Sequence, residues 1–402
     1  MKKKYNIIIY ILLIIPYIKL PGYILGNTLD TIYDIYKIIS CALIFVFYIY
    51  KYRKISKMLV AITLFQFSFI ISTVINGNLN NVFDQTIQGL SIISICMLAE
   101  FGIKEDCKQF LKAMCVVLTV LTLANSYTMI KYYLKGMYVD ELNHWEYYFL
   151  GYDNSSFFIE FPLLIYSACY SYMQYKKINA FTWIMTGIIA FSYFYVKSTT
   201  SLIMIVIFAI FLLTYRWKAW KKILDFRVVI TVFVALFLLI VMFNIQSHFA
   251  NFLENVLQKE VTLTGRDYIW EQAKSYIVKS PIIGYGMEDF EILMSKFGIN
   301  HVHDIILDIL YNGGMIALSI YFVILNLCKK QLNKDRNSFI LNVISIGIFI
   351  YLFSGIFDYY NNKYIIFTFF ILAAYANRIA ESIKEKEKWR NECKEQNEVS
   401  LT

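Results

Sequence analysis

"HVHDIILDILYNGGMIALSIYFVILNL", residues 301–327, places two histidines and an aspartate directly before an apolar run that is long enough to cross a bilayer. A transmembrane helix needs about 20 mainly apolar residues to span the ~30 Å hydrocarbon core. Asp308 lies one turn inside the run, on the same helix face as Asp304. A carboxylate within a span is costly unless it faces a polar cavity. The stretch therefore predicts a membrane helix with a polar site at its N-terminal end.

Apolar runs of this kind recur along almost the whole chain, which is 402 residues long and 58% hydrophobic, with a mean hydropathy of +0.54. These values are well above those of soluble domains, so we expect an all-α polytopic integral membrane protein with about twelve transmembrane helices. The expected spans are 6–24, 30–50, 57–75, 83–103, 109–131, 155–174, 178–196, 199–215, 226–246, 304–327, 338–357 and 363–379. The first run lacks a small-residue cleavage site, so we expect it to be a retained helix.

Charge predicts the orientation of these spans. Most of the 38 Lys and Arg residues fall in the segments that lie on the same side as the N-terminus. The positive-inside rule then places both termini in the cytoplasm of a cell with this protein in its plasma membrane. The net charge of +9 is explained by topology and by attraction to anionic membrane lipids, so we expect no nucleic-acid partner. The seven cysteines fall in spans or on the cytoplasmic side, which argues against a disulfide framework.

Two outer segments exceed the length of simple connectors. Residues 132–154 are aromatic and acidic, which suits either sugar stacking or an interfacial aromatic belt, and residues 247–303 form the larger loop. Loops of this length are usually functional or independently folded. We expect four parts: spans one to nine in 1–246, an extracytoplasmic helical loop that carries the catalytic residues in 247–303, spans ten to twelve in 304–379, and a charged cytoplasmic tail in 380–402.

The centre of the larger loop is "TGRDYIWEQAKSYIVKSPIIGYG", residues 264–286. Thr264 and Asp267 resemble a capping box, and Pro281 with the following glycines should end the helix. Arg266 then lies in the first helical turn, where free backbone N–H groups favour an anion and a guanidinium can bind phosphate through two hydrogen bonds. An arginine that only contacts lipid headgroups remains the alternative.

The two histidines of the opening stretch also allow several interpretations. A metal site would need both rings to converge, but residues two apart diverge on a helix, so no metal site is expected. Simple hydrogen bonding to headgroups is a second alternative. Other ionisable residues, including Asp84, Glu160 and Lys197, crowd the outer ends of spans. Secondary transporters bind their substrates near the midplane, so this distribution disfavours transport.

The two motifs together resemble the O-antigen ligase/polymerase superfamily. The shared pattern is a Gly-Arg pair that opens a helix, an Ile-Trp pair, a Pro-x-x-Gly-x-Gly turn, a His-Asn-x-x-Leu segment and a downstream glycine. It falls on Gly265, Arg266, Ile269, Trp270, Pro281, Gly284, Gly286, His303, Leu307 and Gly314. Three positions depart from it: Asp304 stands where Asn, Gln or Ser is usual, Ala317 replaces Gly, Thr or Val, and "KSTTS" has Thr200 where an arginine is common. Lys197 can supply that charge instead.

The resemblance implies a GT-C glycosyltransferase that uses an undecaprenyl-diphosphate-linked oligosaccharide in the outer leaflet. Arg266, with Lys197, would stabilise the departing lipid diphosphate, and His303 would be the base or a diphosphate contact, oriented by Asp304 or Asp308. Gly265 and His301 would belong to the diphosphate site. No metal or other cofactor is implied, so full activity in excess EDTA is expected.

Three functions are compatible with these motifs. The first is a polymerase of capsular or exopolysaccharide repeat units, and the second is a ligase that moves lipid-linked glycan once to another acceptor. The third is a transporter or flippase of lipid-linked sugars. Polymerases and ligases share the Arg266 and His303 motifs, whereas a composition rich in Ile, Lys, Asn and Tyr suggests a single-membrane bacterium and so favours a capsule polymerase. A flippase and chain-length regulators of the same pathway are the expected protein partners.

Overall fold

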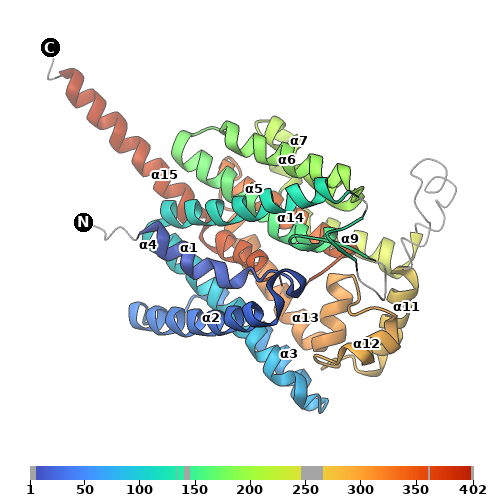
Figure 1. Cartoon of the computed structure of the whole chain (residues 1–402). Helices are drawn as coiled ribbons and strands as arrows, with labels where there is room; N and C mark the ends of the chain where they lie inside the picture. Colours follow the sequence, from blue (N-terminus) through green and yellow to red (C-terminus); the bar gives the residue numbers. More distant parts are fainter. Residues whose placement is uncertain (1–5, 134, 140–144, 246–265, 361–362, 400–402) are drawn as a thin grey trace.

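The computed structural model describes residues 6–133, 135–139, 145–245, 266–360 and 363–399, and helices dominate it (Figure 1). The helices of the N-terminal half are α1 (Ile7–Ile14), η1 (Ile15–Tyr17), α2 (Gly22–Lys51), α3 (Lys57–Ile75), α4 (Leu79–Lys131), α5 (Asp153–Tyr175) and α6 (Ala180–Tyr195). Those of the C-terminal half are α7 (Thr199–Thr214), α8 (Lys218–Ile223), α9 (Phe226–Phe237), η2 (Leu238–Met242), α11 (Arg266–Lys279), α12 (Phe290–Phe297), α13 (Ile305–Leu332), α14 (Phe339–Phe357), η4 (Tyr364–Phe367) and α15 (Thr368–Val399).

Among the described residues, 6 helices are long and apolar enough to cross a membrane. They are Gly22–Lys51, Lys57–Ile75, Leu79–Lys131, Ile305–Leu332, Phe339–Phe357 and Tyr364–Lys384. Shorter apolar helices follow Ile7–Tyr17, Ala180–Tyr195, Thr199–Thr214 and Phe226–Met242. The prediction of a helical, multi-pass membrane protein is therefore confirmed, whereas the number of twelve spans is not established by these helices.

The N-terminal helices differ from the predicted spans. The expected first span, 6–24, is interrupted, because α1 passes into η1 at Pro16 and α2 begins only at Gly22. The expected fourth and fifth spans are two arms of α4, which bends at Asp106, where φ is −148° and ψ is 74°. The bend brings Phe110 against Gly102, where a Cβ atom would lie 2.5 Å from the Phe110 ring. Only glycine at position 102 allows this close approach.

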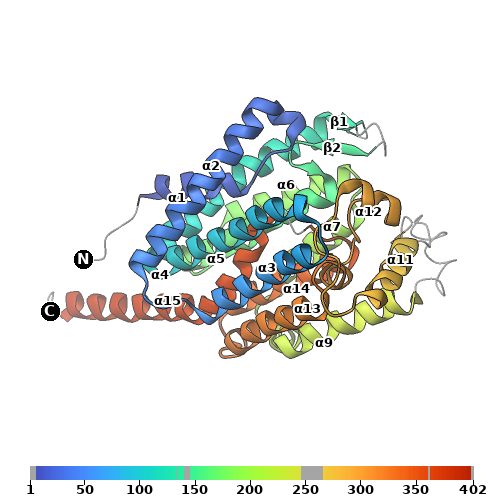
Figure 2. The same cartoon turned by 90° about the horizontal axis from the view of Figure 1, so that it is seen from below.

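The helices pack around a core that α3, α4, α5, α13, α14 and α15 share. α3 lies between α4 and α13, and α14 packs on both α13 and α15 (Figures 1 and 2). Polar side chains cross this core in pairs: the hydroxyl of Tyr166 on α5 donates to Thr368 at the start of α15 over 2.6 Å. Such pairing satisfies hydroxyl groups that could not reach water.

A small antiparallel sheet corrects the expectation of a purely helical chain. Its strands are β1 (Tyr138–Val139), β2 (Glu146–Tyr148) and β3 (Gly151–Tyr152), in that order, all within the aromatic outer segment. Tyr138 pairs with Tyr147, and Tyr23 at the start of α2 stacks on Tyr138 with ring centroids 4.8 Å apart. The sheet thereby fixes the aromatic segment against the N-terminal helices.

The two ends of the bundle carry different elements. The sheet, α11 and α12 gather at one end, whereas α1 begins and α15 ends at the other (Figure 2). α15 continues as a helix to Val399 through most of the predicted tail. Basic side chains make polar contacts at the second end, where Lys384 pairs with Asp335 over 2.9 Å and Arg378 donates to the carbonyl of Lys104 over 3.1 Å.

Candidate active site

The stretch that opens α13 is extended rather than helical, and it turns sharply at His303. His303 has a φ of 60°, in the left-handed region that few non-glycine residues adopt. The next residue, Asp304, is the N-cap of α13: its Oδ1 accepts hydrogen bonds from the N–H groups of Ile306 at 2.9 Å and Leu307 at 2.8 Å. The turn folds the two imidazole rings together, with centroids 4.0 Å apart, so the prediction that they diverge is wrong. It failed because both residues precede the helix.

Both histidines meet a carboxylate that the sequence prediction missed. Asp358 directly follows α14, and its Oδ1 lies 2.8 Å from His303 Nδ1 and 3.1 Å from His301 Nε2. Its Oδ2 accepts a hydrogen bond from the Tyr360 hydroxyl at 3.1 Å and lies 3.9 Å from a guanidinium nitrogen of Arg266. The Asp358 side chain is only 4% exposed. Asp358 therefore joins the two sequence motifs in one buried cluster.

The protonation states of the Asp358 and His303 pair follow from their surroundings. Burial alone would raise the pKa of Asp358, but the charge and hydrogen bonds of His303 and His301 outweigh it and hold the pKa well below its usual value. Burial lowers the pKa of His303 to about 4, although Asp358 acts in the opposite direction. At neutral pH the carboxylate is thus ionised and the imidazole is neutral. Because an ionised carboxylate only accepts, Nδ1 of His303 carries the proton and Nε2 is the basic nitrogen.

Arg266 is the first residue of α11 that the structure describes, and its side chain is 14% exposed. It lines a small crevice with Asp358 and with polar residues from three other helices. These polar residues are Asn154, Thr200, Ser201 and Ser354. Ser198 donates to Asn154 over 2.9 Å, which fixes the start of α7 against that of α5. The "KSTTS" segment therefore lies next to Arg266, although the two are far apart in the sequence.

The other predicted site residues occupy different positions. Lys197 is exposed and left-handed, with a φ of 59°, and makes no ion pair with the described part of the cluster. Asp304 is buried and caps α13, whereas Asp308 is buried one turn later and lines a cavity. The contacts of His303 within the described residues run to Asp358 and not to either of these carboxylates. Gly265 and Thr264 lie outside the described residues.

A backbone clamp fixes Arg266 relative to His303. The turn after α11 pairs with a break in α13 at Gly314, where φ is 62° and ψ is −164°. Tyr285 N donates to Tyr311 O at 2.7 Å, Gly286 N to Asn312 O at 3.0 Å, and Met315 N to Pro281 O at 2.8 Å. These bonds satisfy backbone groups that the break removes from the helix ladder.

The glycines of this clamp are required by the close approach of the two backbones. A Cβ atom on Gly284 would lie 2.5 Å from the Tyr311 carbonyl oxygen, and one on Gly314 would collide with the carbonyl of Ile282. The α3–α4 connection closes the clamp from the other side, since Asn76 and Asn78 each donate over 3.0 Å to the carbonyls of Gly284 and Tyr285. The prediction that Pro281 and the glycines end the helix is confirmed, because α11 ends at Lys279.

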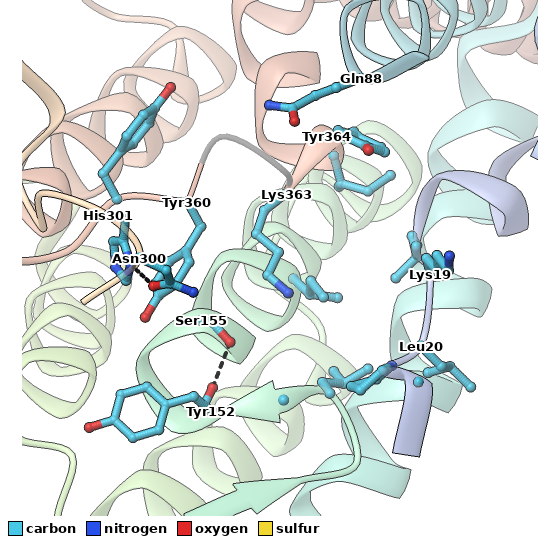
Figure 3. Close-up of a pocket in the computed structure, with 18 of the residues that line it drawn as sticks. Lys19, Leu20, Gln88, Tyr152, Ser155, Asn300, His301, Tyr360, Lys363 and Tyr364 are labelled. Carbon is cyan, nitrogen blue, oxygen red and sulfur yellow. Dashed lines mark hydrogen bonds between the residues drawn. The ribbon is translucent and has the colours of Figure 1, made fainter. Parts of the chain in front are cut away.

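A cavity of about 700 Å³ lies beside the cluster (Figure 3). His301, Asp308 and Tyr360 form its wall on the side of the cluster. The small sheet contributes Tyr147 and Tyr152, the residue before β2 contributes Trp145, and amide side chains add Gln85, Gln88, Asn300 and Asn312. A wall of aromatic faces with scattered amide groups suits the alternating apolar and hydroxylated faces of sugars. Part of the aromatic segment 132–154 therefore lines this cavity.

One group of side chains has the composition of a metal site. The ligand atoms of His301, His303 and Asp358 all lie within 4.8 Å of one another. Both imidazoles, however, are at hydrogen-bonding distance from the same carboxylate oxygen, and the Arg266 guanidinium lies 3.9 Å from the other oxygen. A divalent cation here would be repelled by the arginine. The donor set therefore fits a hydrogen-bonded histidine–carboxylate pair better than a metal site.

A comparison with protein families matches one segment of the chain. Residues 181–322 match the model of the O-antigen ligase family. The resemblance to the O-antigen ligase/polymerase superfamily is thereby confirmed, and no curated protein matches the chain. A transferase that acts on lipid-linked glycans, in a multi-pass membrane protein, is what this family implies.

The O-antigen ligase match contains only part of the cluster. It runs from α6 into α13 and so includes Lys197, Arg266, His301 and His303. Asp358 lies beyond it, 55 residues after His303. The one signal for Asp358 in the sequence is a lone carboxylate directly after the apolar run 338–357, at the same end of the bundle as the histidines. An ionisable residue at the end of a span can indicate a functional site even when it belongs to no motif.

Proposed function

We propose that the chain is a polymerase that joins undecaprenyl-diphosphate-linked oligosaccharide repeat units into a capsular or exopolysaccharide on the outer face of the plasma membrane. The observation that carries the proposal is the meeting of Arg266 and His303 at one buried carboxylate, Asp358, beside a cavity of about 700 Å³. This arrangement combines a cation for a leaving phosphate, an oriented base and room for sugars. The topology that belongs to this proposal has about twelve spans and both termini in the cytoplasm.

The proposed reaction transfers a glycan between two hydroxylated partners. The acceptor hydroxyl attacks C1 of the donor sugar, the bond from C1 to the phosphate oxygen breaks, and its electron pair leaves with the lipid diphosphate. Nε2 of His303 takes the proton of the attacking hydroxyl, while Nδ1–H remains hydrogen-bonded to Asp358 at 2.8 Å. Asp358 stabilises the resulting imidazolium, as carboxylates do in other histidine-based sites.

Arg266 has a separate role, because negative charge grows on the leaving diphosphate. A guanidinium at the start of α11 adds its charge to the free N–H groups of the helix terminus. The crevice around Arg266 holds only about 10 Å³, roughly the volume that a water-sized probe occupies. We expect a bound diphosphate to replace the 3.9 Å contact between Arg266 and Asp358 with contacts from Arg266 to its own oxygens.

A ligase is the second candidate, since the matching family model is described as O-antigen ligase. A ligase would use the same Arg266 and His303 chemistry and would differ in the acceptor, which would not be a second lipid-linked repeat unit. Transport is the third alternative, which the position of the cluster at the end of the bundle disfavours.

The deciding experiment is a transfer assay with purified protein and undecaprenyl-diphosphate-linked repeat units from the producing strain, with products resolved by size. We expect a ladder of multiples, lost in Arg266→Ala and His303→Ala. Arg227→Ala is the matched control, because Arg227 is exposed and pairs with Asp225 over 2.9 Å, away from the described site residues. A single transfer to an added acceptor, without a ladder, would establish a ligase. Intact donor with folded protein and no product would reject both transferases.

A further inference from the structure

One lysine in the large cavity differs from the other basic residue of its wall. Lys19 is paired twice, with Asp30 at 3.0 Å and with Asp34 at 2.8 Å. Lys363, which directly precedes η4, has no hydrogen-bond acceptor or carboxylate for its amino group among the described residues, and its side chain points into the cavity on the side of Ser155 (Figure 3). The cavity thus holds one compensated cation and one that is not compensated by the described chain.

The amine of Lys363 keeps its charge at neutral pH. Burial lowers the pKa of Lys363 to about 8, so most of the amine is protonated at pH 7. The side chain is partly exposed and lines the cavity, so its charge is directed at whatever fills that space. A cation in this position, without a carboxylate partner among the described residues, favours an anion that enters the cavity.

The rest of the wall indicates what carries this anion. Aromatic side chains line the cavity from several elements, and they include Trp145, whose ring lies 5.6 Å from that of Tyr152. Aromatic faces of this kind bind the apolar faces of sugar rings, and the amides of Gln88 and Asn300 can hydrogen-bond to hydroxyl groups. His301 and Tyr360 bring the same wall to the Asp358 cluster. The anion is thus most naturally part of the glycan.

We infer that the cavity selects a glycan with an acidic group, a carboxylate or a phosphate on one of its sugars, and that Lys363 binds this group. The inference rests on the proposed transferase function and adds a substrate class to it. The diphosphate of the lipid carrier has the same chemistry and is the competing source of the anion. The position of Lys363 in the cavity lined by aromatic and amide side chains, apart from the Arg266 crevice, favours the acidic sugar.

The test measures binding, so it does not depend on transfer. The full-length protein is titrated with three probes: the repeat-unit oligosaccharide released from its lipid, the same oligosaccharide with its acidic group neutralised, and undecaprenyl diphosphate without sugar. Lys363→Gln removes the charge and Lys363→Arg keeps it. We expect Lys363→Gln to weaken binding of the acidic oligosaccharide about tenfold, as for the loss of a charged hydrogen bond. Lys363→Arg should bind the acidic oligosaccharide about as well as the wild type does. Lys363→Gln and the wild type should bind the neutralised oligosaccharide about equally.

Three results would overturn the inference. A repeat unit composed only of neutral sugars would overturn the inference, because it has no acidic group for Lys363 to bind. Equal binding of the acidic oligosaccharide by wild type and Lys363→Gln would remove the role of Lys363. Weaker binding of undecaprenyl diphosphate by Lys363→Gln would assign the anion to the carrier instead. Thermal unfolding controls for folding, and Lys363→Gln should be at least as stable as wild type because it removes an uncompensated charge. If the proposed transfer fails while these binding differences persist, only the proposed function is rejected.

Discussion

Two buried aspartates flank His303 in space, and their contacts assign them different roles. Asp304 uses Oδ1 to cap α13 through two backbone N–H groups. Asp358 uses Oδ1 for the imidazole nitrogens of His303 and His301. Asn can replace Asp as a helix cap because it offers the same oxygen. Asn cannot replace the negative charge that fixes the tautomer of His303 and stabilises its protonated form.

These roles predict opposite outcomes for two matched substitutions. Asp358→Asn should lower the transfer rate by about 10²-fold or more, the usual contribution of an oriented base. Asp304→Asn should retain activity within a few-fold, since the cap survives. Both rates are measured with the ladder assay on protein of confirmed fold. Loss of activity in Asp304→Asn with activity retained in Asp358→Asn would restore Asp304 as the orienting carboxylate.

The pH dependence of transfer tests the protonation state of His303. A base must be neutral to accept a proton, and the pKa of His303 is lowered to about 4. The value of kcat/KM should therefore stay level from pH 7 down to about 5 and fall only as the pH approaches 4. An unperturbed histidine, with a pKa of about 6.5, would lose half its activity near that pH. A half-maximal rate near pH 6.5, in protein that recovers at pH 7, would contradict the buried, neutral base.

At the scale of elements, the clamp between the turn after α11 and the break in α13 connects the two motifs. The break at Gly314 has backbone angles that are essentially restricted to glycine. Glycine here is needed twice, for its conformation and for the contact with Ile282. Arg266 and His303 are held at the two ends of the elements that the clamp joins, so their relative position depends on it.

Substitution of a glycine in the clamp tests whether backbone strain or the close contact with Ile282 contributes more to stability. Gly314→Ala should destabilise the protein by about 2–6 kcal/mol, from the strain of a backbone conformation that is essentially restricted to glycine, at about 1–3 kcal/mol, and from overpacking at about 1–3 kcal/mol. Gly298→Ala is the control, because Gly298 also has a positive φ, 73°, but nothing lies within 4 Å of its Cβ position. Gly298→Ala should lower the stability only by the cost of a left-handed backbone, about 1–2 kcal/mol. Thermal unfolding of both variants in detergent tests this, and equal losses would show that the close contact contributes nothing.

At the scale of the whole molecule, the arrangement of loops predicts sidedness. Ser295 on α12 and Asn337 before α14 are both exposed, and they lie at opposite ends of α13. In a background without native cysteines, Ser295→Cys should react with a membrane-impermeant maleimide in intact cells, whereas Asn337→Cys should react only after lysis. Labelling of Asn337→Cys in intact cells, with Ser295→Cys protected, would invert the orientation derived from the basic residues.

Sequence patterns predicted much of this architecture because hydropathy and charge act locally along the chain. Most of the expected spans coincide with apolar helices, and Arg266 lies in the first turn of α11 that the structure describes. The bend at Asp106 and the break at Gly314 were not predicted, because each depends on packing partners such as Phe110 and Ile282. The contact of His303 with Asp358 was missed for the same reason: it joins residues 55 positions apart that share no motif. Capping by Asp304 could be predicted from its position directly before an apolar run, because Asp is a common N-cap residue.

The break in α13 makes the segment 266–303 and this helix depend on each other for their backbone hydrogen bonds. The backbone groups of the segment complete the hydrogen bonds of a membrane span, and the span completes those of the turn. Unpaired amide groups are not tolerated in hydrocarbon, so neither partner can satisfy its own needs alone. We therefore expect that the segment, excised and produced in water without α13, does not keep its shape.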